Sequence, residues 1–536
     1  MKRALSFLLI LAMLLGLGLA TPAAAEGELV DGKFAETRTI TVEVFDRSND
    51  GGTDPTNNKF TDYIKAGMLE KYNVAVEFVR VPRWTEVDEL NNLLASGAAP
   101  DICVTYSYPT IQTYANMGGV LNLDPYLTEY KDQLTNLWSL LGDYNIYYDQ
   151  DPETGELWAI EAILAERARI NTFVREDWLA ALNMEAPTTL QEFEDMLVAF
   201  SENAELLLGD DASRMIPFTT SYDVGWRTDH LTTSFVPNDG EDDELYIHGF
   251  DDRHLLYPGY KEGIRVLNKW YNMGLVWKDF ALYGEGDTTE DNNLKAGFVG
   301  AFIHNWDYPY RNGEDSIQAN LQRNVGEDAA FIAIECFEND AGVYRKYLAD
   351  TVDRKVFFPA TNDEPLASLL YLDFISSPET IIYLQIGDEG VNHEVKENGA
   401  IATLPAVAPD IMNSGMNIDY TITINGLNLF DEELTNISKA LNYAAVDSRL
   451  IETALVASKN EGRTVGHYNV GAINAEEGVG TSLTEKRNTF LCQSVVAPVD
   501  QFDAVYDAGM DDYLASGGQA IIDERAEKLA AFYAAE

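Results

Sequence analysis

Three aspartates and a serine lie within residues 45–58, FDRSNDGGTDPTNN, and oxygen ligands at this spacing can bind calcium. Asp46, Ser48 and Asp50 match the first three ligand positions of an EF-hand loop. The last position of such a loop is a glutamate that binds through both oxygens, and this chain has Asn57 there. A helix precedes an EF-hand loop, whereas an alternating, strand-like run precedes this one. The pattern therefore argues against a calcium site.

A phosphate-binding loop is the second chemistry that this polar stretch could supply. Such loops need glycines with a lysine or a helix N-terminus, and no carboxylates nearby. Asp46, Asp50 and Asp54 would repel a phosphate. The stretch instead suits the rim of a pocket for a neutral, hydroxyl-rich ligand, because carboxylates and amides can bind adjacent hydroxyls. Asp46, Arg47 and Asn58 are its candidate contacts.

Aromatic residues in other polar loops could cover the apolar face of a sugar ring. Three of these candidates lie in the N-terminal part of the chain, and four polar or aromatic candidates lie further along. They are Trp84, Tyr106 and Tyr108, followed by Trp226, Arg227, Trp306 and Asp307. Trp84 and Trp306 follow strand-like runs, so we expect their rings to be available for stacking. Trp178, Trp270 and Trp277 lie in or beside helical patterns, and we assign them to the core.

The sequence does not require an enzyme. A glycosidase needs two carboxylates across the scissile bond, but with 88 acidic residues any fold brings some pair together. Glu161 lies in a strand-like run, and we expect it to form hydrogen bonds in a hinge or pocket. The chain has no GxSxG, HExxH, CxxC, Walker or dinucleotide motif, and its six histidines lack metal-ligand spacing. We predict no catalytic residue, no metal and no cofactor, with a secreted glycoside hydrolase or lyase as the alternative.

The charge of the chain excludes several partners. Its 37 basic and 88 acidic residues give a net charge of −51. Such a surface repels nucleic acid and anionic lipid headgroups. We therefore expect no nucleic-acid partner.

The loops at 45–58, 82–86 and 106–108 each follow an expected strand. The alternating runs TITVEVF and NVAVEFVRV and the short apolar run PDICVTY are separated by two helical patterns, FTDYIKAGMLEKY and WTEVDELNNLLASG. Strands that alternate with helices predict a parallel sheet with helical cover. Ligands bind beyond the carboxyl ends of such strands, so the three loops should share one edge.

The first 25 residues have the pattern of a secretory signal peptide. Lys2 and Arg3 precede the apolar run ALSFLLILAMLLGLGLA, and small residues end at Ala25. We predict cleavage after Ala25 and an exported protein, periplasmic or extracellular, with an uncleaved membrane anchor as the alternative. No cysteine near the cleavage point provides a lipid-attachment signal. Cys103, Cys336 and Cys492 each lie in an apolar context that favours burial.

Six stretches, in order, resemble one family. They are LLASGAAPDICV, FVREDWLAALNMEAPTTLQEFEDML, YKEGIRVLNKWYNMGLVWKDF, GFVGAFIHNWD, PLASLLYLDFISSPETIIYLQIGDEGVNHEV and FDAVYDAGMDDYLASGGQAIIDERAEKLAAFY. Together they resemble the extracellular solute-binding proteins of bacterial ABC importers, in the group that contains maltose-binding protein. The branch they most resemble is the sugar-binding lipoproteins of Gram-positive bacteria. The resemblance runs from about residue 38 to the C-terminus.

The resemblance implies an α/β fold of two lobes, each a mostly parallel sheet flanked by helices, closing on a solute by a hinge. It places lobe 1 at 38–158 plus about 330–400, and lobe 2 at 163–328 plus about 401–536. LWAIEAI would be the first crossover between the lobes and DAAFIAIE the second.

The family's function is transport rather than catalysis. The resemblance implies a monomer that captures a sugar or oligosaccharide and delivers it to the membrane permease subunits of an ABC importer. A peptide or another polar solute is an alternative ligand, and an exported adhesion module is a further alternative function. Two features depart from the family. The lipid-anchoring cysteine is absent, and LLLGDDASRMIPF keeps too few oxygen ligands for the calcium loop that many relatives carry.

Overall fold

The computed structural model describes residues 29–535, with short gaps. The gaps are 49–52, 153, 237–241, 249–254, 258, 285–286, 345, 444, 465–466, 472 and 477–478. The predicted signal peptide and Asp50 therefore lie outside the described residues.

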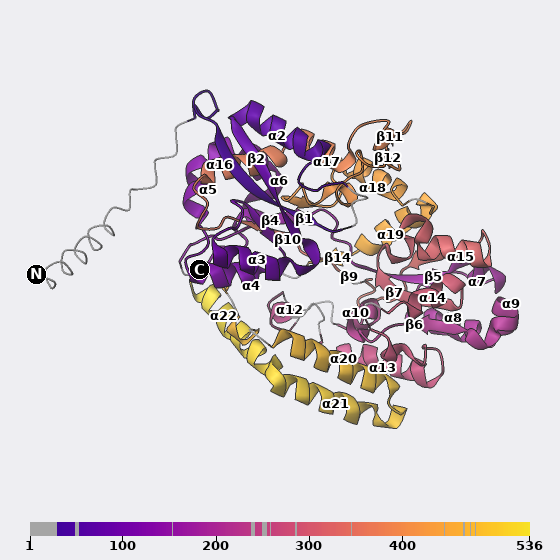
Figure 1. The fold of residues 1–536 in the computed structure, drawn as a ribbon. Helices are drawn as coiled ribbons and strands as arrows, with labels where there is room; N and C mark the ends of the chain where they lie inside the picture. Colours follow the sequence, from indigo (N-terminus) through magenta and orange to yellow (C-terminus); the bar gives the residue numbers. More distant parts are fainter. Residues whose placement is uncertain are drawn as a thin grey trace, which may run out of the picture. The chain divides into compact units, whose positions relative to one another are not determined.

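The chain divides into two compact units, each made of three segments (Figure 1). Unit 1 comprises the residues up to Ala165, then Val352–His393 and Leu404–Asn428. Unit 2 comprises Glu166–Thr351, Glu394–Thr403 and the residues from Leu429 onward.

The unit boundaries differ from the predicted lobes at residues 330–351, 394–400 and 404–428. DAAFIAIE is not the second crossover, because its strand β8 (Phe331–Ile334) pairs with β5 (Ile170–Arg175) inside unit 2. The chain instead enters unit 1 again at Val352. Residues 404–428 also belong to unit 1, where β13 (Ile424–Asn425) pairs with β4 (Ile160–Leu164).

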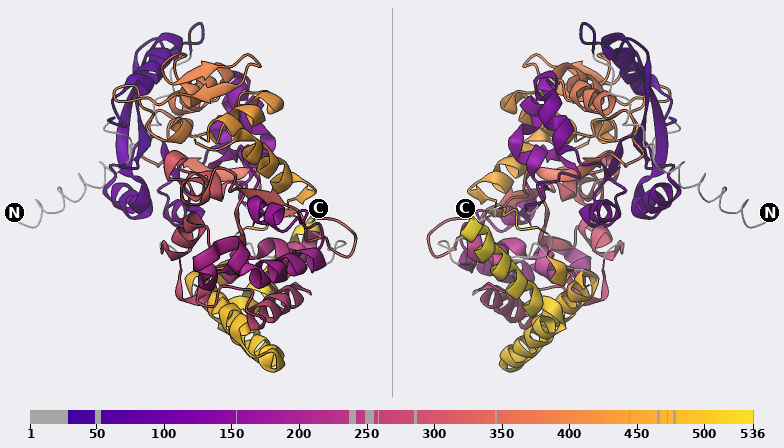
Figure 2. Two further views of the ribbon diagram at one scale, coloured as in Figure 1. Left: turned by 90° about the vertical axis from the view of Figure 1, so that its right-hand side faces the viewer. Right: turned by 90° about the vertical axis from the view of Figure 1, so that its left-hand side faces the viewer.

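The sheet of unit 1 begins with the three predicted strands. They are β1 (Arg38–Asp46), β2 (Val74–Pro82) and β3 (Cys103–Thr105). β1 and β2 are parallel over nine residues, and a parallel bridge joins Val42 to Ile102 beside β3. Figure 2 shows β1 and β2 as a long twisted pair. The sheet continues through β10 (Val352–Phe357), which is antiparallel to both β3 and β4.

The helices of unit 1 cover this sheet. They are α2 (Lys59–Tyr72), α3 (Glu86–Ser96), α4 (Tyr108–Asn116), α5 (Asp124–Tyr130), α6 (Thr135–Tyr147), α16 (Pro365–Ile375) and α17 (Pro378–Ile386). In α2, Phe60, Ile64 and Met68 are fully buried and recur every four residues, as an amphipathic helix requires. Gly67 lets α2 approach α16 closely, since a Cβ there would lie 2.3 Å from the Phe374 ring.

Unit 2 contains a second, mixed sheet in the order β6-β7-β5-β8. β6 (Ile216–Thr219) and β7 (Val299–Asn305) are parallel, whereas β5 is antiparallel to both β7 and β8. The expectation of mostly parallel sheets is therefore wrong for this unit, because β5 runs opposite to both of its neighbours.

The helices of unit 2 are more numerous than those of unit 1. The N-terminal set is α7 (Glu176–Ala181), α8 (Leu190–Glu202), α9 (Ala204–Leu208), α10 (Val224–Arg227), α11 (Asp229–Thr233), α12 (Asp242–His248), α13 (Tyr260–Asn272), α14 (Thr289–Ala296) and α15 (Ile317–Val325). The C-terminal set is α18 (Glu432–Leu441), α19 (Ser448–Lys459), α20 (Gly480–Val496), α21 (Phe502–Tyr513) and α22 (Gln519–Ala535). Among the described helices, none combines the length and apolar character of a membrane span.

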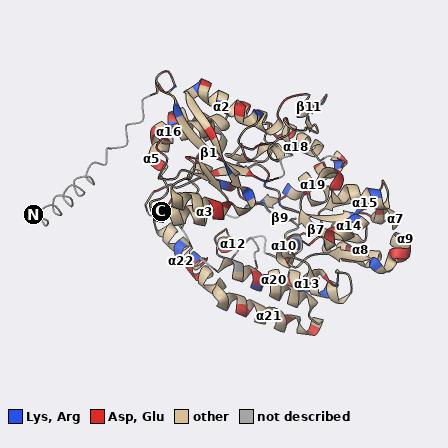
Figure 3. Ribbon diagram, in the orientation of Figure 1, with Lys and Arg blue, Asp and Glu red and all other residues tan. Residues whose placement is uncertain are grey.

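The cysteines are free and buried, as their apolar contexts predict. Acidic residues are spread over the helices of both units (Figure 3).

Candidate ligand-binding site

Three loops of unit 1 meet at the carboxyl ends of β1, β2 and β3. β1 and β2 end together, with Asp46 opposite Pro82. Beyond them, the guanidinium carbon of Arg47 lies 5.9 Å from the centre of the Trp84 ring. Phe45 and Tyr106 stack with their ring centres 6.3 Å apart and their planes 17° apart. The prediction that these loops share one edge is confirmed.

Trp84 is the most exposed aromatic side chain at this edge. It lies in the short turn Arg83–Thr85 between β2 and α3, and 72% of its surface is accessible. Two guanidinium groups flank the indole, those of Arg47 and of Arg83, whose carbon lies 5.4 Å from the ring centre. An indole held by cation–π contacts and open to solvent offers a flat apolar surface for stacking.

Each arginine at this edge is paired with a carboxylate. Arg47 donates two hydrogen bonds to Asp419, of 2.7 and 2.9 Å. Arg83 lies 3.2 Å from Glu86. Hydrogen bonds from Arg47 to Asp419 are the main cause of the raised pKa of its guanidinium. The positive charges beside Trp84 are therefore compensated.

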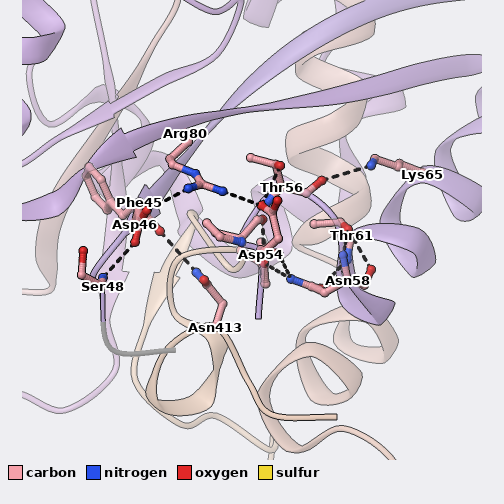
Figure 4. Close-up of polar contacts among 12 residues, drawn as sticks. Phe45, Asp46, Ser48, Asp54, Thr56, Asn58, Thr61, Lys65, Arg80 and Asn413 are labelled. Carbon is pink, nitrogen blue, oxygen red and sulfur yellow. Dashed lines mark hydrogen bonds and ion pairs between the residues drawn. The ribbon is translucent and has the colours of Figure 1, made fainter. Parts of the chain in front are cut away.

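A third arginine joins the two carboxylates of the first loop (Figure 4). Arg80 lies 3.4 Å from Asp46 and donates a 2.8 Å hydrogen bond to Asp54. Asp46 also accepts the backbone N–H of Ser48, at 2.8 Å. The Asp46 side chain is 18% exposed. The role of Asp46 as a ligand contact stays a prediction.

Asn58 serves the protein itself. Its side-chain oxygen accepts the N–H groups of Phe60 and Thr61, at 3.0 and 3.2 Å, which caps the N-terminus of α2. Its side-chain nitrogen donates to the Tyr420 hydroxyl, at 2.6 Å, and to the Asp54 carbonyl. These hydrogen bonds use the side-chain oxygen and nitrogen of Asn58, the atoms that were predicted to contact a ligand.

The segment 413–420 positions the first loop, and the sequence reasoning missed it. Asn413 donates a 3.3 Å hydrogen bond to the carbonyl of Phe45, and the Tyr420 hydroxyl donates a 2.8 Å bond to that of Pro55. Asp419 holds Arg47 between these two contacts along the chain. No local pattern could have revealed them, since Arg47 and Asp419 are 372 residues apart.

Two buried glutamates support the third loop. Glu86 accepts the N–H of Tyr106 at 3.0 Å and the hydroxyl of Thr105 at 3.1 Å. The ring centre of Tyr106 lies 4.2 Å from the Arg83 guanidinium carbon. Burial raises the pKa of Glu43 to about 8, and the charge of Glu86 adds to this shift. Glu43 is therefore mostly protonated at neutral pH, which keeps negative charge from accumulating under the loops.

Tyr108 and Glu161 form a second group in unit 1, around Asp149 and Lys355. The Tyr108 hydroxyl donates to the carbonyl of Asp149, at 3.1 Å. Burial, and then the neighbouring Asp149, raise the pKa of Glu161 to about 9. Lys355 lies 3.2 Å from the Glu161 carboxyl, which has no exposed surface. Glu161 is thus buried beside Lys355, and its role as a hydrogen-bonding group of a hinge or pocket stays a prediction.

The predicted contacts of unit 2 lie around α10 and the end of β7, and two of them are occupied within the protein. Arg227 is buried and donates two hydrogen bonds to Glu290, of 2.7 and 2.8 Å. Asp307 accepts the Tyr443 hydroxyl at 2.7 Å and Arg311 Nε at 2.6 Å. The Arg227 guanidinium and the Asp307 carboxylate are therefore both bound to other side chains of the protein.

The two tryptophans of this group differ in exposure. Trp306 is only 6% exposed and packs edge-on to Tyr443, with ring centres 5.9 Å apart. The expectation of an available Trp306 ring is not met, because it belongs to the apolar core of unit 2. Trp226 is half-buried and packs edge-on to His304, at 4.8 Å. Among the described residues, no cluster of three or more histidines, cysteines or carboxylates could hold a metal ion.

One curated protein and several solved structures are similar to this chain. No protein-family model matches it. Lipoprotein LipO of Bacillus subtilis is 26% identical over 220 residues, which cover 40% of this chain. The match spans 41% of that relative's length.

Solved structures cover far more of the chain. An HMO-binding, ABC-transporter-associated solute-binding protein from Bifidobacterium longum infantis superposes with a TM-score of 0.62 at 15% identity, covering 92% of this chain and 98% of that one. The S. pneumoniae ABC-transporter substrate-binding protein FusA, in complex with kestose, gives 0.62 at 13% identity, covering 93% and 100%. Alginate-binding protein AlgQ2, without calcium ion, gives 0.57 at 15% identity, covering 93% and 99%. The chain therefore has the α/β fold of the two-lobe solute-binding proteins that serve ABC transporters.

Proposed function

We propose that this protein is an exported solute-binding component of an ABC importer and that it captures a neutral oligosaccharide. The observation that carries this proposal is the exposed Trp84 ring, flanked by two arginines whose charges are compensated by Asp419 and Glu86. Such a surface combines a flat apolar face with hydrogen-bonding groups and little net charge. Uncharged sugar rings, which present an apolar face and a rim of hydroxyls, match both features.

Other proteins of this fold support a carbohydrate ligand, and its neutral charge is inferred from the compensated arginines beside Trp84. Their names or bound ligands mention HMO, kestose, alginate and N-glycan, all carbohydrates. The proposed partners are the permease subunits of an importer, with ATP hydrolysed by other chains. We propose a monomer that catalyses no reaction. Export agrees with the predicted signal peptide and with the relative that is a lipoprotein.

A thermal-shift screen with product analysis tests this function. The full mature chain is heated with individual neutral oligosaccharides, including kestose and milk oligosaccharides, and each sugar is recovered and examined by mass spectrometry. A ligand at 100 times its Kd stabilises a folded protein by about 2.7 kcal/mol, so a true ligand should raise the Tm saturably. We expect such a rise for some sugars, with each sugar recovered intact. Cleaved sugar would support the hydrolase or lyase, and stabilisation by peptides alone would support a peptide-binding protein.

A further inference from the structure

Asp419 lies beside the arginine that flanks the exposed tryptophan. Its carboxylate accepts hydrogen bonds from Nε and Nη2 of Arg47, and its side chain has no exposed surface. The same guanidinium lies 5.9 Å from the centre of the Trp84 ring. A sugar stacked on Trp84 would therefore meet an arginine whose charge is already compensated.

Asp419 also lies near a second arginine, Arg354. Nη1 of Arg354 lies 3.9 Å from its carboxylate, and the Arg354 side chain is fully buried. Arg354 also donates to the carbonyls of Thr421 and Ile424, at 3.1 and 2.9 Å. Because an arginine in a protein cannot lose its proton, removing the charge of Asp419 would leave two uncompensated cations in unit 1.

The other arginines of this edge do not depend on Asp419. Arg83 is compensated by Glu86, and Arg80 by Asp46 and Asp54. The charge balance beside Trp84 can therefore be changed at Asp419 while these pairs stay in place.

This arrangement bears on the difference between neutral and acidic sugars. A free guanidinium binds a carboxylate through two parallel, charge-assisted hydrogen bonds. In Arg47, the Nε–Nη2 edge is already bound to Asp419, so a second carboxylate could use only the Nη1–Nη2 edge of a guanidinium whose charge is compensated. The carboxylate of a uronate in this site would lose its bound water and find no unpaired cation in exchange. A sugar hydroxyl carries no charge, so it needs no cation.

We propose that Asp419 restricts the Trp84 site to uncharged sugars, by occupying and neutralising Arg47. The inference rests on the proposed function, which it deepens by naming a residue that determines specificity. Asp419 acts through Arg47, so it is a positioning residue that need not touch the sugar.

The test compares one sugar in two charge states. The probes are the neutral oligosaccharide with the largest thermal shift and the same oligosaccharide after oxidation of its primary alcohols to carboxylates. Calorimetry measures both Kd values for the wild type, for Asp419→Asn and for Asp373→Asn. Asp373 is a suitable control because it is equally buried in unit 1 but caps α6, accepting the N–H groups of Asn136 and Leu137.

The expected result is a change in preference. The wild type should bind the neutral sugar more tightly, and Asp419→Asn should shift the ratio of the two Kd values at least tenfold toward the acidic sugar. Added salt should reduce that shift, because it screens the new charge. Asp373→Asn should leave the ratio unchanged. If the substitution only disordered the loop, both sugars would bind more weakly. The ratio of their Kd values and the salt dependence of that ratio would not change.

Folding of the variant is addressed by a second change. Asp419→Asn combined with Arg354→Met frees Arg47 without leaving a buried cation at residue 354. Wild-type binding of the acidic sugar as tight as that of the neutral one, or an unchanged ratio in the folded variants, would overturn this inference alone. If the wild type binds no oligosaccharide, the proposed function itself fails.

Discussion

Arg47 and Asp419 are joined by two hydrogen bonds, of 2.7 and 2.9 Å, across 372 residues of sequence. This contact ties the loop after β1 to the segment that returns to unit 1 after Leu404. It also sets the charge beside Trp84, the feature on which the proposed function rests.

Trp84→Ala should weaken oligosaccharide binding without affecting the fold. The ring is 72% exposed, so its loss creates no cavity, and the Tm should stay within about one degree of the wild type. Loss of a stacking surface worth about 1–2 kcal/mol lowers the affinity roughly fivefold to thirtyfold. Calorimetry and a thermal melt measure the two effects. Tyr144→Ala, which removes an exposed aromatic from α6, should change neither, and an unaltered Kd in Trp84→Ala would remove Trp84 from the site.

Trp306→Ala should lower the stability of the fold rather than remove a sugar contact. The ring is 6% exposed and packs in the core of unit 2, so its removal leaves a cavity that costs about 3–5 kcal/mol. Denaturant unfolding followed by circular dichroism measures the free energy of unfolding. A variant as stable as the wild type, with weakened sugar binding, would restore Trp306 as a ligand contact.

Glu290→Gln should destabilise the protein because it leaves the buried Arg227 unpaired. Breaking a buried ion pair by removing one partner costs about 3–5 kcal/mol. Glu314→Gln is the matched control, since it removes the partner of Arg323 from a solvent-exposed pair of 3.1 Å. That change should cost under about 1 kcal/mol. Equal denaturation midpoints for the two variants would show that the Arg227 pair is not buried as described.

Glu43→Gln should make the stability of the protein less dependent on pH between about 4.5 and 8. The pKa of Glu43 is about 8 in the folded chain, against an ordinary 4.5. The folded chain thus keeps a proton that the unfolded chain releases, so the stabilising contribution is complete below pH 4.5 and is lost as the pH rises to 8. The wild type should lose stability over this range relative to the variant, by on the order of a few kcal/mol.

Melting curves between pH 5 and 8.5 measure this difference. Glu77→Gln removes an exposed carboxylate from the neighbouring strand β2 and should follow the wild type. Parallel curves for the wild type and Glu43→Gln would contradict a protonated Glu43.

The local features of unit 1 could be predicted from the sequence, but their long-range partners could not. Alternation in TITVEVF and NVAVEFVRV predicts β1 and β2, and the short apolar run PDICVTY predicts β3, which is buried throughout. Trp84 could be found because it directly follows a strand. Asp419 could not, since its role depends on a segment that meets Arg47 only after the chain has passed through unit 2.

The errors have a common physical cause. Trp306 and Asp307 also follow a strand. Tyr443, however, packs against the Trp306 ring and donates a hydrogen bond to the Asp307 carboxylate. Asn58 lies in the polar stretch that predicts a pocket rim, but α2 begins at the next residue and the Asn58 side chain caps that helix. Whether a polar or aromatic residue at a strand end faces solvent or its own protein is decided by distant segments, which local patterns do not contain.

Calorimetric titration of the mature wild-type chain with the neutral oligosaccharides that raise its Tm tests the central claim most directly. We predict saturable binding of one sugar per chain, recovery of that sugar uncleaved, and at least a roughly fivefold weaker Kd for Trp84→Ala. Absence of binding to every neutral oligosaccharide, or conversion of the sugar to products during the titration, would contradict the account.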